Sequence, residues 1–170
     1  MFDFAFELVV GLEGGFVDHK DDKGGATKYG ITKLRYPNED IPNLTIERAK
    51  FLYKRDFWDR FKIDLLPEKY RIVVFDMYVN HSPRATGLVI QRAINSKAGF
   101  DAVVVDGSIG NNTIGGLTKY KPELFRVHAF RAKYYSDIVR NNPSQIVFYV
   151  GWINRILKLN RTLNETGRRR

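Results

Sequence analysis

The sequence predicts a mostly α-helical protein with one small irregular β or loop element near its N-terminus. Three observations support this prediction: apolar residues recur at helical spacing in most segments, proline or hydroxyl residues precede several of these segments, and glycines gather in one polar stretch. The chain has 170 residues, of which 44% are hydrophobic. This is enough for one packed domain, or for two small halves that share a core.

The first segment, residues 2–12, admits two interpretations. Phe2, Phe6 and Val9 lie at helical spacing, which favours a short helix. The alternation of Phe2, Phe4 and Phe6 is also compatible with a strand.

The later segments combine helix start signals with apolar residues on one face. The helices are expected over about residues 45–57, 67–80 and 82–94, from a cap at Thr113, over 122–140, and from Ser144 to about Leu159. Residues 16–33 are polar and rich in glycine, and are expected to form a loop or a small irregular hairpin.

The positive charge of the chain is unevenly distributed. Residues 1–85 contain 14 basic and 14 acidic side chains, whereas residues 86–170 contain 14 basic and 5 acidic ones, so the second half carries the whole net charge of +9. Such a field attracts polyanions, including nucleic acid, anionic membranes and the polymers of a bacterial wall. Arg126, Arg131 and Lys133 are expected to belong to this basic surface.

Several classes of site are not expected. The chain has no cysteine, which excludes disulfides, thiol nucleophiles and cysteine zinc sites. Its three histidines and its aspartates do not follow the spacing of metal-binding motifs, so we expect no metal and no cofactor. No apolar run approaches the roughly 20 residues of a membrane span, and no secretory signal is recognised.

Two carboxylates lie close together in the sequence near the N-terminus. Glu13 stands in Glu-Gly-Gly, where an apolar segment ends, and Asp22 follows nine residues later. Cleavage of a glycosidic bond requires one carboxyl that stays protonated through poor solvation and a second that stays ionised to activate water or to stabilise positive charge. Asp21 is an alternative second carboxylate. A helix that ends in glycines before a charged surface turn is the structural alternative.

These residues are similar to the signature of glycoside hydrolase family 108, the bacterial and phage N-acetylmuramidases. The likeness extends in order over about residues 6–156. It is carried by Glu13-Gly14-Gly15-Phe16-Val17 with Asp22, by residues 24–32, 53–58, 75–80 and 88–95, and, for a predicted peptidoglycan-binding region, by residues 105–110, Thr113, Phe148 and 151–155. Two departures concern the shape of the loop: Lys23 stands where the family usually has proline, and residues 18–20 are more charged than is typical.

The resemblance implies a lysozyme-like multi-helix fold and hydrolysis of the β-1,4 bond between N-acetylmuramic acid and N-acetylglucosamine. It assigns the general acid to Glu13. The order Glu, Asp, Thr is also similar to the triad of phage-type lysozymes, which adds Asp22 and Thr27, although the interval between these two is one residue shorter here. The choice between Asp21 and Asp22, and between inversion and retention, stays open.

Substrate contacts are expected from four further residues. They are Tyr29, Trp58, Asn80 and Asp21. Aromatic rings pack against sugar faces and an amide can bond acetamido groups, although single aromatic residues are more often part of a core and Asn80 is also a capping candidate.

For the whole chain, we expect a lysozyme-like muramidase region over residues 1–100, a helical peptidoglycan-binding region over 101–166 in the same globule, and a basic tail over 167–170. Bacterial peptidoglycan is the expected partner of a monomer that binds no nucleic acid. The protein would be made in the cytoplasm and reach the wall after export or release through a holin pore, as phage endolysins do.

Two other functions are compatible with the sequence. A non-catalytic wall-binding or secretion-assisting protein would keep the fold without turnover. Nucleic-acid binding by the basic half is supported by charge alone, because no recognised binding motif accompanies it.

Overall fold

The computed structural model describes residues 1–11 and 26–167 of the chain. Within these ranges it contains seven α-helices and one two-stranded antiparallel sheet, so the prediction of a mostly α fold with a small β element is confirmed. The chain divides into two compact units, Met1–Asp64 and Leu65–Arg170. Among the described residues, no helix combines the length and the apolar character needed to cross a bilayer.

Unit 1 begins with helix α1 (Phe2–Val9), which decides between the helix and strand interpretations of this segment. Ala5 and Phe6 are buried, whereas Phe4 is exposed, as expected for a helix with one apolar face. Gly11 follows with a φ of +79°, the left-handed conformation common just after a helix. The helix therefore ends before the predicted limit at residue 12.

Helix α2 (Ile46–Tyr53) begins at the predicted cap. The hydroxyl of Thr45 accepts a hydrogen bond from the backbone N–H of Arg48 at 3.2 Å. The helix continues directly into a π-helical turn, η1 (Lys54–Asp59), in which the N–H of Arg60 bonds the carbonyl of Arg55, five residues earlier. A short 3₁₀ turn, η2 (Ile63–Leu65), follows.

Aromatic side chains join α1 to α2 and η1. Phe2 meets Trp58 edge to face with ring centroids 5.4 Å apart, and Phe6 meets Tyr53 in the same way at 5.5 Å. Tyr53 also stacks on Phe57 at 5.4 Å. Buried rings in offset or edge-to-face contact provide much of the apolar area that stabilises this unit.

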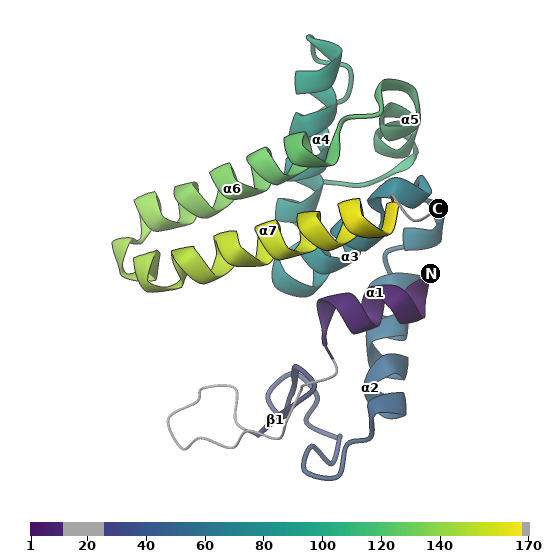
Figure 1. Cartoon of the computed structure of the whole chain (residues 1–170), viewed down its shortest axis with the longest axis vertical. Coiled ribbons are helices and arrows are strands. Elements are labelled where there is room, and N and C mark those ends of the chain that lie inside the picture. The colour runs from purple at the N-terminus through teal and green to yellow at the C-terminus, as the bar shows by residue number, and fades with distance from the viewer. Residues whose placement is uncertain (12–25, 168–170) are drawn as a thin grey trace. The chain divides into compact units, whose positions relative to one another are not determined.

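Unit 2 consists of five helices. They are α3 (Glu68–Asn80), α4 (Pro83–Ala98), α5 (Asn111–Tyr120), α6 (Leu124–Asn141) and α7 (Ile146–Gly167), with a 3₁₀ turn, η3 (Pro143–Gln145), before α7. Figure 1 shows α6 in green and α7 in yellow lying side by side in opposite directions. Tyr135 of α6 stacks on Trp152 of α7 with centroids 4.9 Å apart.

The prediction that Thr113 caps α5 is wrong. The helix begins at Asn111, with the N-cap at Gly110, three residues before the predicted cap, and Thr113 is buried inside its first turn. The Thr113 hydroxyl donates to the carbonyl of Ser108 at 3.1 Å and accepts from the amide of Gln91 on α4 at 3.2 Å. Thr113 thus holds the loop before α5 against α4.

A buried carboxylate joins three helices of unit 2. Asp76 of α3 lies 2.6 Å from a guanidinium nitrogen of Arg131 on α6 and 2.6 Å from one of Arg155 on α7. The side chain of Arg131 is 0% exposed. The expectation that Arg131 belongs to the basic surface is therefore wrong: its charge is neutralised inside the unit.

Two histidines lie near this buried pair. Nε2 of His81 accepts a hydrogen bond from Nε of Arg131 at 3.0 Å. Burial, and then the charge of Arg131, lowers the pKa of both His81 and His128 to about 4. Among the described residues, neither ring nitrogen of His128 has a hydrogen-bond partner. Both imidazoles are neutral at pH 7.

Candidate functional site

Three of the predicted site residues, Glu13, Asp21 and Asp22, lie outside the described residues. Their roles stay predictions. The structure describes the segment that follows them in sequence, the hairpin of β1 (Thr27–Lys28) and β2 (Ile31–Thr32), which carries Thr27 and Tyr29.

The hairpin has the tight turn that its sequence favours. Thr27 pairs with Thr32 and Lys28 with Ile31, which leaves Tyr29 and Gly30 as a two-residue connection. Both have positive φ, +51° and +73°, as a type I′ turn requires. Glycine adopts this conformation freely, whereas a tyrosine there is strained, so the ring of Tyr29 is held at the tip at an energetic cost.

A contact with α2 fixes the position of this turn. The hydroxyl of Tyr53 donates to the backbone carbonyl of Tyr29 at 3.2 Å. A Cβ at Gly30 would lie only 2.5 Å from the same hydroxyl, so a side chain there has no room. The hairpin that bears Thr27 is thus attached to the aromatic core of unit 1.

Trp58 occupies a different environment from the hairpin. Its side chain is 1% exposed, its ring packs on Phe2, and its indole N–H donates to a carboxylate oxygen of Asp64 at 2.9 Å. This is the position of a core residue. A role for Trp58 in substrate binding stays a prediction, and the burial of its ring does not favour it.

Asn80 lies at the end of α3 in unit 2. Its side-chain amide donates to the backbone carbonyl of Asp76 at 2.8 Å, one helical turn earlier. The residue itself is exposed. Its predicted contact with acetamido groups is not tested by this arrangement.

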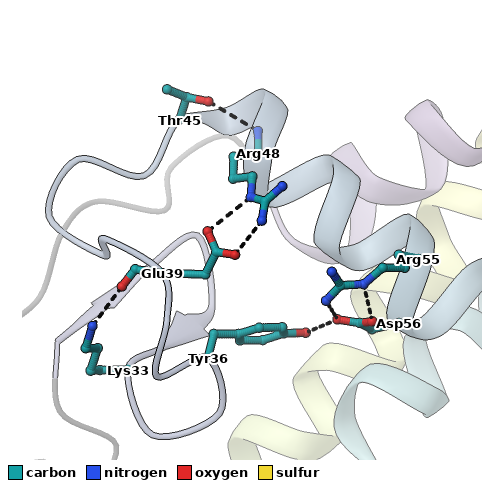
Figure 2. Close-up of polar contacts among 7 residues, drawn as sticks. All are labelled: Lys33, Tyr36, Glu39, Thr45, Arg48, Arg55 and Asp56. Carbon is teal, nitrogen blue, oxygen red and sulfur yellow. Dashed lines mark hydrogen bonds and ion pairs between the residues drawn. The ribbon is translucent and has the colours of Figure 1, made fainter.

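Unit 1 also contains a cavity of about 510 Å³ whose lining is rich in arginine. We call it the arginine cavity. Its lining consists of residues 35–39, Arg48, Arg55, Asp56 and Arg60. Figure 2 shows part of this lining: Glu39 reaches Arg48 from the loop after the hairpin, and Asp56 of η1 lies between Tyr36 and Arg55.

Both carboxylates of the arginine cavity are already paired. Glu39 receives two hydrogen bonds from Arg48, at 2.7 and 3.1 Å, and Asp56 receives two from Arg55, both at 2.7 Å. These bonds lower the pKa of Glu39 and of Asp56, so both are ionised at neutral pH.

Tyr36 completes the set of bonds around Asp56. Its hydroxyl donates to the second carboxylate oxygen at 3.0 Å. Burial of the phenol, together with this bond to a carboxylate, raises the pKa of Tyr36 to about 12. Tyr36 is therefore a neutral hydrogen-bond donor, and the lining keeps four guanidinium groups against two carboxylates.

Sequence reasoning did not find the arginine cavity. Its residues come from the loop after β2, from α2 and from η1, and no periodic pattern brings them together. The seven-residue interval between Arg48 and Arg55 is a helical spacing and was the one available signal, but the loop residues 35–39 cannot be placed by it.

Comparisons with known proteins give the family. Residues 6–82 match the family model described as Glycosyl hydrolase 108, and residues 86–157 match the one described as Predicted Peptidoglycan domain. The chain contains a glycosyl hydrolase 108 domain. It is a glycoside hydrolase that acts on peptidoglycan, with the glycosyl hydrolase domain first and the peptidoglycan domain second. The arginine cavity lies within residues of the first domain.

A solved structure supports the lysozyme-like fold of this glycosyl hydrolase. The structure of SagA from Brucella abortus aligns with a TM-score of 0.73 over 96% of this chain and 94% of the other, at 24% sequence identity. At this identity the likeness concerns the fold alone. A search of the curated proteins finds no match to the chain.

Proposed function

We propose that this glycosyl hydrolase is an N-acetylmuramidase that cleaves the β-1,4 bond between N-acetylmuramic acid and N-acetylglucosamine. The observation that carries the proposal is the pair of consecutive family matches. A glycosyl hydrolase region that includes Glu13 and the Thr27 hairpin is followed directly by a peptidoglycan region.

The proposed chemistry assigns one role to each residue of the motif. Glu13, at the end of an apolar segment, donates a proton to the leaving glycosidic oxygen. Asp22, or its neighbour Asp21, stays ionised and activates water or stabilises the positive charge of the transition state. The hydroxyl of Thr27, on the anchored hairpin, orients the attacking water.

The test is digestion of purified peptidoglycan by wild type and by Glu13→Gln. We expect wild type to release fragments that end in reducing N-acetylmuramic acid, as identified by mass spectrometry. Glu13→Gln should lower turnover by at least about a thousandfold, because the amide cannot donate the proton, while wall binding in a pull-down persists. Glu7→Gln is the matched control, since Glu7 is an exposed residue of α1 outside the motif.

The other outcomes identify the alternatives. If the fragments end in reducing N-acetylglucosamine, the enzyme is a glucosaminidase and not a muramidase. Binding without any cleavage by wild type would support the non-catalytic wall-binding or secretion-assisting protein.

We further propose that the enzyme serves host lysis as a phage endolysin, made in the cytoplasm and released through a membrane pore. The support is the similarity of its motif to phage muramidases. Expression in a bacterial cytoplasm should leave turbidity unchanged until the membrane is permeabilised. Lysis without permeabilisation would contradict this route.

A further inference from the structure

The arginine cavity has more positive charge than its own carboxylates neutralise. Arg48 is paired with Glu39 and Arg55 with Asp56, in both cases through two hydrogen bonds. Among the described residues, Arg35 and Arg60 form no hydrogen bond or close ion pair with a carboxylate, although both line the same cavity and the charge of Arg35 helps to lower the pKa of Asp56. The lining therefore carries a net charge of +2 from four arginines and two carboxylates.

Contacts within the lining hold several of these charged side chains in place. The guanidinium carbon of Arg35 lies 4.5 Å from the ring centroid of Phe57, so the charged plane rests on an aromatic face. Tyr36 and Arg55 hold Asp56, and Arg48 holds Glu39, so the two carboxylates of the lining are fixed by their own partners. Arg35 and Arg60 are both exposed and are not hydrogen-bonded to either carboxylate, so their guanidinium groups are available to an external anion.

We propose that the arginine cavity is a subsite for a free carboxylate of the peptide stems of peptidoglycan, received by Arg35 and Arg60. This inference rests on the proposed function, which supplies the polymer. The planar guanidinium fork matches a carboxylate in two parallel hydrogen bonds. A neutral sugar ring has no charge to pair with these groups, and a metal cation would be repelled by them.

The size of the cavity fits this ligand. A space of about 510 Å³ takes a terminal amino acid with its carboxylate and part of the preceding residue. The subsite would distinguish stems with free carboxylates from stems in which these are amidated. Its function would be to select among chemically different walls rather than to cleave the glycan.

The test compares two substrates and two charge-matched variants. The substrates are native peptidoglycan and the same material with its stem carboxylates converted to neutral methylamides. For wild type, KM should be about two- to fivefold higher on the amidated wall, the loss expected for one exposed charged pair. For Arg35→Gln/Arg60→Gln the ratio of the two KM values should fall to about one.

The control variant is Lys119→Gln/Lys158→Gln, which removes the same charge from exposed residues of unit 2. It should keep the wild-type ratio, because these two lysines lie outside the arginine cavity, whereas a general attraction to the wall would weaken equally in both variants. The variant Arg35→Lys/Arg60→Lys keeps the positive charge but lacks the planar guanidinium group. It should give a ratio of the two KM values between those of wild type and of Arg35→Gln/Arg60→Gln. Thermal melts of all variants identify any loss of fold.

Failure of this inference is distinguishable from failure of the proposed function. If wild type cleaves both walls with the same KM, or if Arg35→Gln/Arg60→Gln keeps the wild-type ratio, the stem-carboxylate subsite is excluded and the muramidase stands. If wild type cleaves neither wall, the proposed function fails. Titration of a free stem tetrapeptide, followed by NMR, then decides the subsite alone: shifts of the arginine side-chain signals that Arg35→Gln/Arg60→Gln removes would support it. Equal shifts with inorganic phosphate would indicate a general anion site and overturn the assignment to stems.

Discussion

Gly30 shows how a single residue fixes the hairpin that carries Thr27. Its φ of +73° lies in the region that side chains rarely adopt, and the hydroxyl of Tyr53 occupies the space where a Cβ would stand. Backbone strain and steric contact therefore act at the same position.

Gly30→Ala should lower the free energy of unfolding by about 2–4 kcal/mol, from the left-handed conformation and from overpacking against Tyr53. Gly99→Ala is the matched control: it has a φ of +84° with no atom within 4 Å of its Cβ, so only the conformational cost of about 1 kcal/mol applies. Urea denaturation measures both. Equal losses in the two variants would show that Tyr53 yields to the new methyl group.

At the scale of the elements, Asp76 links α3, α6 and α7 through Arg131 and Arg155. Asp76→Asn should cost about 3–5 kcal/mol in unfolding free energy, because it leaves the charge of Arg131 buried without its partner. Asp137→Asn, which breaks surface pairs with Lys133 and Arg140 on α6, should cost less than about 1 kcal/mol. A small effect of Asp76→Asn in chemical denaturation would mean that water reaches the buried arginine.

The ion pairs of Asp76 also predict which fragments of the chain fold on their own. Helix α3 lies inside the glycosyl hydrolase match, whereas α6 and the part of α7 that carries Arg155 lie inside the peptidoglycan match, yet all three share one buried charge cluster. A fragment over residues 65–170 should therefore fold, whereas one over 83–170 should not, because Arg131 loses its carboxylate. Circular dichroism melts and amide NMR dispersion measure this. A cooperative melt of the shorter fragment would make the peptidoglycan domain an independent module.

At the scale of the whole molecule, the buried histidines make stability depend on pH. His81 and His128 have pKa values of about 4 in the folded protein, below the ordinary value of 6.5. The unfolded chain therefore binds more protons between these limits, so stability is full above about pH 6.5 and is lost as the pH falls toward 4. Each histidine contributes on the order of 3 kcal/mol to this loss.

His128→Leu should reduce the histidine-linked loss of unfolding free energy between pH 7 and pH 4 by about half, since one of the two buried histidines is gone. At pH 7 the variant should be as stable as wild type or more so, because the buried ring nitrogens have no partner among the described residues. Urea denaturation at both pH values measures this. An unchanged pH dependence would show that His128 already binds a proton in the folded protein.

The sequence was sufficient for the local features of the fold and insufficient for its long-range contacts. Thr45 begins α2 as predicted, and Ser82 begins α4 through its hydrogen bond to Ala85, because caps act within a few residues. Arg131 and Thr113 were misplaced because their partners, Asp76 and Gln91, are distant in the chain. A periodic pattern indicates a buried face but does not identify what packs against it.

In the candidate site, too, local features could be predicted from the sequence and long-range contacts could not. The motif around Glu13 and Thr27 was identified by its order in the sequence, which is local information. The arginine cavity combines a loop, a helix and a π-helical turn, so it could be found only from their arrangement in space.

The π-helical turn η1 has a consequence for both the core and the arginine cavity. Each residue of an α-helix advances by about 100°, so one residue more or fewer in a turn rotates everything that follows by that angle. Shortening Lys54–Asp59 by one residue to a regular α turn would swing Phe57 and Trp58 off the aromatic core and carry Asp56 away from Tyr36. The number of residues in this turn, and not only their chemistry, therefore directs Phe57 and Trp58 into the aromatic core while Asp56 faces the arginine cavity.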